Sequence, residues 1–337
     1  MPRPYAETAG HNMGNAMTRR IVWTALFALI AASSALAQDY PSRRINIIVP
    51  FSPGTAFDAI AREAGQKISE RWGQPVVVDN KPGASGMLGT EAFVQAAPDG
   101  YTIGTIGAPV TVHKAMIKNL RYDPMTSFTP LGVLAGNTVV LVVNPAVFPM
   151  KSLAELVATV KAKPGVYNYS SPGLGTLQQM GMELFQQQLG LKVQHVPYRG
   201  QAQALTGFIG GEVHFTYLPV NSALPHAQAG KLRILAATGT RRSPVVPEVP
   251  TFAELSHASL DFDLWFGFAG PANLPPAVVR KWEAELKAIG AMPDVQDRLR
   301  KRGLTPSYKT AAETDALLKS EIVRWTAVAQ KAGLEPR

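Results

Sequence analysis

The chain has 337 residues, of which 46% are hydrophobic and 17% are charged, and it contains no cysteine. This length allows two domains of ordinary size, and the composition excludes a disordered chain. The lack of cysteine excludes disulfides, thiolate metal sites and a lipoprotein anchor. The net charge of +9 comes from dispersed basic residues, which indicates a solvated basic surface and no nucleic-acid partner.

The N-terminal segment, residues 1–37, is typical of a secretory signal peptide. Two arginines precede the apolar run Ile21–Ala32, and a small-residue pattern ending at Ala37 follows. The run is short for a membrane span, so we expect cleavage after Ala37 and a free periplasmic protein. The alternative is an uncleaved anchor helix. Met17 stands where such a signal normally begins, so residues 1–16 are expected to be a misassigned start.

Two segments share one pattern, Ile45–Asp58 and Asn168–Thr176. Each predicts a buried strand, a Pro/Gly turn and the start of a helix. Such a turn directs backbone N–H groups and the positive end of a helix dipole at one point, which suits a small carboxylate. The predicted donors are the N–H groups of Ser52–Thr55 and Gly173–Thr176, together with the hydroxyls of Thr55, Ser171 and Thr176. The alternative is a pair of ordinary well-formed turns.

Strand-like and helix-like segments alternate along the chain, which predicts an α/β fold with two mostly parallel sheets. Strands are expected at Val76–Asp79, Thr102–Ile106, Thr138–Val143, Tyr167–Ser170, Val193–Val196, Val213–Leu218, Ile234–Ala237 and Leu264–Phe268. Capping boxes predict helix starts at Ser152, Thr251 and Thr310. Three more helical segments are predicted near the C-terminus, at Pro275–Ile289, Pro293–Gly303 and Ala311–Ala332.

The C-terminal helices are expected to pack back on the first domain, which makes that domain discontinuous. Lobe 1 would then comprise residues 38–138 and 263–337, and lobe 2 residues 139–262. The strands near residues 138–143 and 264–268 would connect the lobes as hinge strands, and the ligand would lie in a cleft between the lobes.

Sequence motifs of catalysis are missing. There is no G-x-S-x-G elbow, H-E-x-x-H pair or Walker A sequence, and the G-x-x-G-x-x-G run at Gly83–Gly89 favours a tight turn over a dinucleotide site. Ser170 and Ser171 lie in a glycine-rich turn without a recognisable base partner. We therefore expect no catalytic residue, no metal and no cofactor, and a protein that is not an enzyme.

Several segments together resemble the Bug family of periplasmic solute-binding proteins, which serve tripartite tricarboxylate transporters. The matching segments are, in chain order, Tyr40-Pro41 with Ile45–Pro50, Pro50–Asp58, Gln74–Ala84, Pro98–Thr102, Gly173–Thr176, His195–Gly200, Ala229–Arg233 and Val249–Thr251. They extend through almost the whole chain after residue 37, so as a set they are specific.

The resemblance implies a two-lobed Venus-flytrap protein with a cleft at the carboxyl ends of the strands. The family binds small carboxylates, among them dicarboxylates, tricarboxylates, amino acids and aromatic acids. Its ligand loops correspond here to Phe51–Asp58, Gly107–Thr111 and Ser171–Thr176. The ligand-binding residues that we predict on this basis are Phe51, Ser52, Pro53, Gly54, Thr55, Asp58, Ala108, Ser171, Gly173, Gly175, Thr176, Tyr198 and Leu218.

This chain departs from the family pattern at positions that bear on the ligand. Thr55 replaces a usual glycine, and Leu218 stands where the family usually has an aspartate that would pair with a ligand amine. Phe57, Leu177 and Leu218 are expected to form an apolar wall, with Tyr198 as a stacking surface or hydroxyl donor. The alternative is that some of these side chains pack in the core. These departures predict an acid without an amine and with an apolar or aromatic body.

The predicted function is therefore non-catalytic capture of a small carboxylate by lobe closure. A monomer would deliver the ligand, transiently, to the integral-membrane subunits of a transporter. The alternative is a sensory co-receptor that presents the ligand-bound form to a sensor kinase. A further alternative, an exported enzyme acting on carboxylates, is weakened by the missing nucleophile–base pair. Asp58 is expected to be structural, near the start of the first helix, and the functional alternative is that it positions the loop or an ordered water.

Overall fold

The computed structural model describes residues 40–336, so the predicted signal peptide at 1–37 lies outside the described residues. Residues 43–336 belong to one compact unit. No helix in the described part of the chain combines the length and the hydropathy that a membrane crossing needs.

The first sheet has six strands in the order β11-β4-β10-β3-β1-β2. The strands are β1 (Ile45–Val49), β2 (Val76–Asn80), β3 (Thr102–Gly107), β4 (Phe128–Asn137), β10 (Leu264–Pro271) and β11 (Thr305–Lys309). β1 runs parallel to both β2 and β3. β10 runs antiparallel to β3 and β4, and β11 antiparallel to β4. The carboxyl ends of β1 and β3 therefore lie side by side.

The second sheet has five strands in the order β7-β6-β8-β5-β9. The strands are β5 (Val139–Val143), β6 (Asn168–Ser171), β7 (Gln194–Pro197), β8 (Phe215–Pro219) and β9 (Arg233–Ala237). β6 is parallel to β7 and β8, whereas β5 is antiparallel to β8 and β9. Both sheets are thus mixed. This confirms the α/β class but corrects the expectation of mostly parallel sheets.

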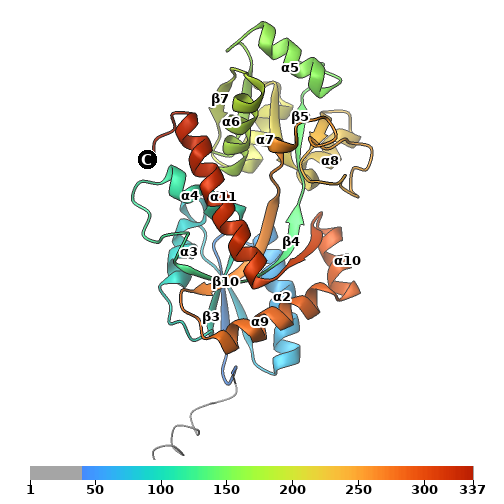
Figure 1. Cartoon of the computed structure of the whole chain (residues 1–337). Coiled ribbons are helices and arrows are strands. Elements are labelled where there is room, and N and C mark those ends of the chain that lie inside the picture. The colour runs from blue at the N-terminus through green and yellow to red at the C-terminus, as the bar shows by residue number, and fades with distance from the viewer. Residues whose placement is uncertain (1–39, 337) are drawn as a thin grey trace, which may run out of the picture. The chain divides into compact units, whose positions relative to one another are not determined.

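The antiparallel pairs have a topological cause. β4 leads directly into β5, so the chain leaves one sheet and enters the other without a crossover helix, and β10 returns beside β4. A strand that passes from one sheet to the other can follow the direction of the βαβ strands in only one of the two sheets. In the other sheet it is antiparallel to them. Figure 1 shows β4 and β5 as one line of chain with β10 running between the same two sheets.

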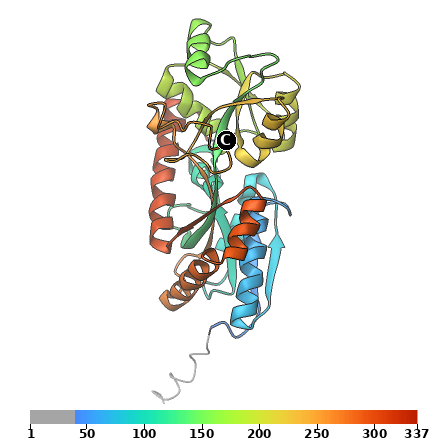
Figure 2. The same cartoon turned by 90° about the vertical axis from the view of Figure 1, so that its right-hand side faces the viewer.

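Helices cover both faces of the first sheet. One face carries α2 (Ala56–Trp72), α9 (Pro276–Gly290) and α10 (Pro293–Lys301), and the other carries α3 (Met87–Val94), α4 (Ala108–Met116) and α11 (Ala311–Lys331). In Figure 2 the red helix α11 and the blue helix α2 lie on opposite sides of the strands. A sheet covered on both faces needs apolar residues on both, and β1 buries the consecutive residues Ile47 and Ile48, whose side chains point to opposite faces.

The second sheet is likewise covered on both faces. α6 (Leu177–Leu189) and the short helix η2 (Ala258–Leu260) lie on one side, and α7 (Gln201–Ile209) and α8 (Val220–Gln228) lie on the other. α5 (Leu153–Ala162) follows β5, and η1 (Ala84–Gly86) precedes α3. One hydrophobic cluster runs from α4 and α11 to the α6 face, because it includes Ala115, Leu177 and Trp325. The domain boundaries expected at 138/139 and 262/263 remain a prediction.

Local signals located most elements, with three exceptions. Ser152 and Thr310 cap α5 and α11, and the capping box at Thr310 is complete. Thr251 and Glu254 form the same pair of hydrogen bonds, but only a turn follows them, so the helix predicted there is wrong. The pattern also missed β4 and β11, whose glycine or proline residues weaken the strand signal.

Candidate functional site

The first predicted loop, residues 50–55, joins β1 to α2. Thr55 has an extended backbone and caps α2, since its side chain accepts a hydrogen bond from the Asp58 N–H. Gly54 has a φ of +84°, a value at which a side chain would be strained, so the turn needs glycine there. Thr55 itself has a φ of −73°, which explains why the usual second glycine is dispensable.

The Asp58 side chain is hydrogen-bonded to the backbone of this loop. It is 5% exposed and accepts hydrogen bonds from the Gly54 N–H, from Asn80 Nδ2 and from Arg62. Burial by itself would raise the pKa of Asp58, but the bonds from Arg62, Gly54 and Asn80 outweigh it and hold the pKa below the usual value. The carboxylate is therefore ionised and already neutralised by Arg62, as expected for a structural residue.

The second predicted loop, residues 172–176, joins β6 to α6 in the same manner. Thr176 caps α6 by accepting from the Gln179 N–H, and the Gln179 side chain accepts from the Gly175 N–H at 2.8 Å. In both loops, therefore, the third helical residue reaches back to a glycine N–H. The difference lies in charge, because the first loop uses a carboxylate and the second a neutral amide.

The hydrogen bonds within the loops correct the predicted set of ligand donors. The hydroxyls of Thr55 and Thr176 donate to the carbonyls of Ser52 and Gly173, and the Ser171 hydroxyl bonds Gly173. Each hydroxyl has one proton, so none of the three is left to donate to a ligand. The N–H groups of Gly54, Thr55, Gly173 and Gly175 also have partners within their own loops. A helix leaves its first N–H groups without an internal partner, and those that precede Asp58 in α2 and Gln179 in α6 are not used by the caps, so they are the donors expected to reach a ligand.

A third helix start lies beside the first loop. α4 begins at Ala108 directly after β3, and a Cβ at Gly107 would come within 2.8 Å of the Phe57 ring. Phe57 in turn stacks on Phe51, with ring centroids 4.3 Å apart, and meets Phe266 of β10 edge-on. The aromatic residues thus form the floor under the two helix starts. Ala108 is fully buried.

Helix α4 sets the spacing between the loops. Its first turn lies beside the loop after β1, and its last residue, Met116, lies against Gly175, where a Cβ would be 3.3 Å from Met116 Cβ. Nine helical residues span about 13 Å. The structure therefore brings Phe51–Asp58 and Ala108 together and holds Ser171–Thr176 at the other end of α4. Ser52, Pro53 and Gly54 are exposed at the open side of the first loop.

Comparison with known proteins shows the family of the chain. Residues 60–334 match the family described as "Tripartite tricarboxylate transporter family receptor". The chain belongs to this receptor family. A UPF0065 protein of Bordetella pertussis is 35% identical over 326 residues, which cover 95% of this chain and 98% of the relative. The family that the sequence resembled is thereby confirmed, and its members are periplasmic binding proteins.

Two solved structures support the fold of this receptor and show ligands in related proteins. Rpa4515 of Rhodopseudomonas palustris, with adipate, has a TM-score of 0.76 and 30% identity, covering 89% of this chain and all of that one. MatC of the same organism, with bound malate, has a TM-score of 0.73 and 28% identity, covering 86% of this chain and 99% of that one. The two-lobed binding-protein fold is confirmed by these matches.

The receptor contains a serine–histidine contact that the sequence did not reveal. Ser171 Oγ lies 2.6 Å from His195 Nε2, and the His195 ring stacks on Tyr169. Burial lowers the pKa of His195 to about 4, so the imidazole is neutral near pH 7. This corrects the expectation that Ser171 has no base partner. Ser171 is fully buried and bonded to its own turn, so the pair holds the loop in place. The adjacency of β6 and β7 was the missing signal.

Two predicted site residues of the receptor point elsewhere. Leu218 is 1% exposed and packs with Val140 and Phe208 in the core on the α7 and α8 side of the second sheet. The Tyr198 hydroxyl donates to Glu212 at 2.6 Å, and its ring lies over Gly207 of α7. Neither side chain lines the loops, which corrects their predicted roles. The strand register decides this, because alternate residues of β8 face opposite sides of the sheet.

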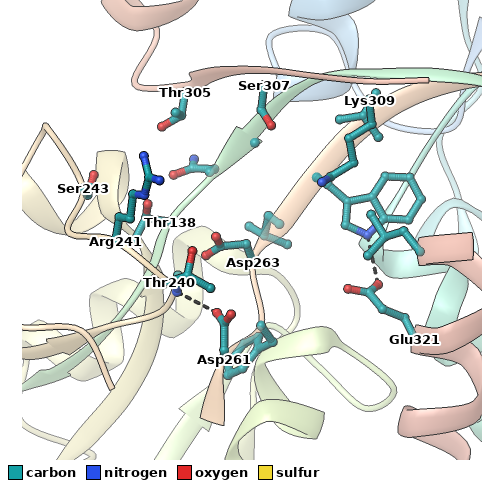
Figure 3. A pocket seen from close by; sticks show the side chains of 18 of the residues that line it. Thr138, Thr240, Arg241, Ser243, Asp261, Asp263, Thr305, Ser307, Lys309 and Glu321 are labelled. Atoms are coloured by element: carbon teal, nitrogen blue, oxygen red, sulfur yellow. Dashed lines mark hydrogen bonds between the residues drawn. The ribbon is translucent and has the colours of Figure 1, made fainter. Parts of the chain in front are cut away.

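One cavity of the receptor lies away from these loops. It has a volume of about 810 Å³ and lies at the β4 and β11 edge of the first sheet, on the other side of β10 from β1. Figure 3 shows polar and charged side chains turned into it, among them Asp261, Asp263 and Glu321. No group of three or more His, Cys, Asp or Glu side chains within residues 40–336 is placed to hold a metal ion.

Proposed function

We propose that this receptor captures a small carboxylate that lacks an amine and delivers it to the integral-membrane subunits of a tripartite tricarboxylate transporter. The supporting observation is the group of three helix starts, those of α2, α4 and α6, at the carboxyl ends of parallel strands. Their first-turn N–H groups and dipoles favour anions. Lobe closure would bring the loop at residues 171–176 towards the loop at residues 51–55, with the α4 start beside it.

The charge balance around the loops favours an acid without an amine. Asp58 is the acidic residue within the two loops, and Arg62 and Asn80 already neutralise it. A ligand ammonium would therefore lose its water without gaining a counterion, which is costly in a closed site. This argument replaces the one from Leu218, whose side chain lies in the core. Adipate and malate, the ligands of the two related structures, both lack an amine.

Thermal unfolding of residues 38–337 with matched ligand pairs tests this proposal. We expect malate or adipate to raise the melting temperature, because a ligand at 100 times its dissociation constant adds about 2.7 kcal/mol of stability. Aspartate and 2-aminoadipate, which carry an added amine, should give no shift. A shift with aspartate and none with malate would refute the amine-free assignment. A sensory co-receptor would bind the same ligand, so co-purification with transporter subunits or with a sensor kinase distinguishes the two roles.

Tyr198 provides a smaller test of which side chains reach the ligand. Because its hydroxyl is bonded to Glu212, we expect Tyr198→Phe to leave carboxylate affinity unchanged and to cost about 1 kcal/mol of unfolding free energy. Calorimetric titration with the best carboxylate measures the first quantity, and urea unfolding measures the second. A tenfold loss of affinity would show instead that the Tyr198 hydroxyl contacts the ligand.

A further inference from the structure

Glu321 of α11 is bonded to two elements that bear on the proposed carboxylate site. Its Oε2 accepts a hydrogen bond from Trp265 Nε1 of β10 at 2.9 Å, and its carboxyl group also accepts from the Thr111 hydroxyl of α4. Glu321 is 9% exposed, and both partners are buried. Helix α11 packs along α4 (Figure 1). One C-terminal side chain therefore links the start of a ligand helix to a strand that connects the two sheets.

Both contacts lie next to the start of α4. Gly107, the residue before α4, pairs with Phe266 of β10, and a Cβ at Gly107 would clash with the Trp265 carbonyl. Thr111 is in the first turn of α4, and its hydroxyl also lies 2.7 Å from the Ala108 carbonyl. The hydroxyl has one proton, so the Ala108 carbonyl and an ionised Glu321 compete for it. The charge of Glu321 therefore bears on the hydrogen bonds of this first turn.

The surroundings of Glu321 allow it to titrate near neutral pH. Burial raises the pKa of Glu321 to about 7, and the negative charge of Asp263 adds to the shift, whereas the two hydrogen bonds and the charge of Arg324 oppose it. Arg324 does not neutralise Glu321 fully, because its guanidinium is hydrogen-bonded to the carbonyls of Asp261 and Ser259. The carboxyl group is therefore neutral in a large share of the molecules at pH 7.

Other ionisable groups near Glu321 come from the elements that pack on α11 or line the same cavity. On α4, burial lowers the pKa of His113 to about 4, so its imidazole is neutral above pH 6. On α6, Glu183 is bonded to Tyr169. The cavity that Glu321 lines also has the basic residues Arg241, Arg242 and Lys309 in its wall. Glu321 is thus the carboxyl group bonded to α4 whose charge changes between pH 6 and pH 8.5.

We propose that Glu321 is a positioning residue that holds the start of α4 against β10 and, through its own protonation, sets how tightly the start of α4 binds the ligand carboxylate. The neutral carboxyl group keeps its bond from Trp265 and places no charge behind the helix start. The ionised group adds a negative charge there, which opposes an anionic ligand. This role rests on the proposed capture of a carboxylate at the start of α4.

The size of the effect follows from the separation of the two charges. Thr111 lies three residues beyond Ala108, a rise of about 4.5 Å, and a hydrogen bond at each end adds about 3 Å. A ligand carboxylate would therefore lie about 10 Å from the Glu321 carboxyl group. At an effective dielectric constant of about 20, two unit charges at this distance change affinity about tenfold. Carboxylate affinity should rise by this factor as the pH falls from 8.5 to 6.

Calorimetric titration of residues 38–337 with malate and with adipate at pH 6 and pH 8.5 tests this role. Both acids are largely ionised at these pH values, since carboxyl groups titrate near pH 4. We expect the parent to bind about tenfold more tightly at pH 6. Glu321→Gln keeps an oxygen for Trp265 Nε1 but has no charge, so it should bind equally at both pH values. At pH 8.5 it should bind about tenfold more tightly than the parent, a gain that a purely structural role would not produce.

Glu285→Gln is the matched control. Glu285 is also a buried glutamate that accepts from a tryptophan, Trp72, and it pairs with Arg71, but it belongs to α9 and contacts the last turn of α2. This variant should keep the pH dependence of the parent. Circular dichroism in the far ultraviolet checks that each variant is folded.

Asp263→Asn separates Glu321 from the carboxyl group nearest to it in charge effect. Asp263 raises the pKa of Glu321, so removing its charge should move the pH dependence to lower pH and not abolish it. Parent-like affinity of Glu321→Gln at pH 8.5 would overturn the role of Glu321. A pH dependence that Asp263→Asn abolishes and Glu321→Gln leaves intact would overturn it as well.

Heteronuclear NMR of the Trp265 indole distinguishes failure of this role from failure of the proposed function. The indole N–H resonance should titrate with a midpoint near pH 7 in the parent and stay fixed in Glu321→Gln. Carboxylate binding without pH dependence, or a fixed indole resonance in the parent, would refute the role of Glu321 alone. Absence of binding by both acids in the parent and in Glu321→Gln would refute the proposed function, and the effect of Glu321 on affinity with it, even where the indole resonance titrates.

Discussion

Replacing Asp58 by alanine is expected to remove about 3 kcal/mol of unfolding free energy and to weaken carboxylate binding at least about tenfold. The carboxylate is 5% exposed and holds Gly54, Arg62 and Asn80 at once. Its loss leaves the Gly54 N–H without its acceptor and Arg62 without its ion-pair partner, and it releases the turn that positions the start of α2. Urea unfolding and calorimetric titration measure the two effects.

Arg62→Ala is the matched control for Asp58. The Arg62 side chain is about half exposed, and its removal leaves Asp58 bonded to Gly54 and Asn80. We expect Arg62→Ala to lower the free energy of unfolding by about 1 kcal/mol and to change carboxylate affinity little. Equal losses of stability in the two variants would show that the ion pair alone matters, and lost binding at full stability in Asp58→Ala would place the carboxylate in contact with the ligand.

The pH dependence of stability is expected to change in opposite directions in Glu321→Gln and His113→Gln. Burial raises the pKa of Glu321 from an ordinary 4.5 to about 7, and burial lowers the pKa of His113 from 6.5 to about 4. The stability linked to Glu321 is therefore present below pH 4.5 and is lost as the pH rises through 7. The stability linked to His113 is present above pH 6.5 and is lost as the pH falls through 4.

In the unmodified protein these two contributions to the free energy of unfolding oppose each other between pH 4.5 and 6.5. Each variant removes one of them, so the two contributions can be measured separately. Relative to the parent, the free energy of unfolding of Glu321→Gln should rise by about 3 kcal/mol as the pH rises from 4.5 to 8. That of His113→Gln should rise by about 3 kcal/mol as the pH falls from 7 to 4. Urea unfolding at four pH values measures both slopes. Parallel curves for a variant and its parent would mean that the group in question titrates normally in the folded protein.

Features that depend on neighbouring residues were predictable from the sequence. The turn and the helix start at Gly54 and Thr55 form by hydrogen bonds that span three or four residues, as do the caps at Ser152 and Thr310. A complete capping box at Thr251 still produced only a turn, because a cap contributes about 1 kcal/mol and tertiary packing decides whether a helix follows.

Features that depend on strand pairing were decided by the tertiary structure. The alternation of β8 places Tyr217 on the α6 side and Leu218 in the opposite core, so the residue that the family pattern singled out does not reach the loops. The contact of Ser171 with His195 exists because β6 and β7 are parallel neighbours in one register. Neither outcome has a local sequence signal, because pairing depends on which distant apolar faces are buried together.

By itself the sequence determined the receptor family, the α/β class and the two proline–glycine turns, because composition, periodicity and short-range hydrogen bonds are properties of adjacent residues. Tertiary structure alone decided that α4 spaces the two loops and that Asn137 and Asp263 line one cavity. Each of these facts joins residues far apart in the chain, and only the energy of burying them together selects the arrangement.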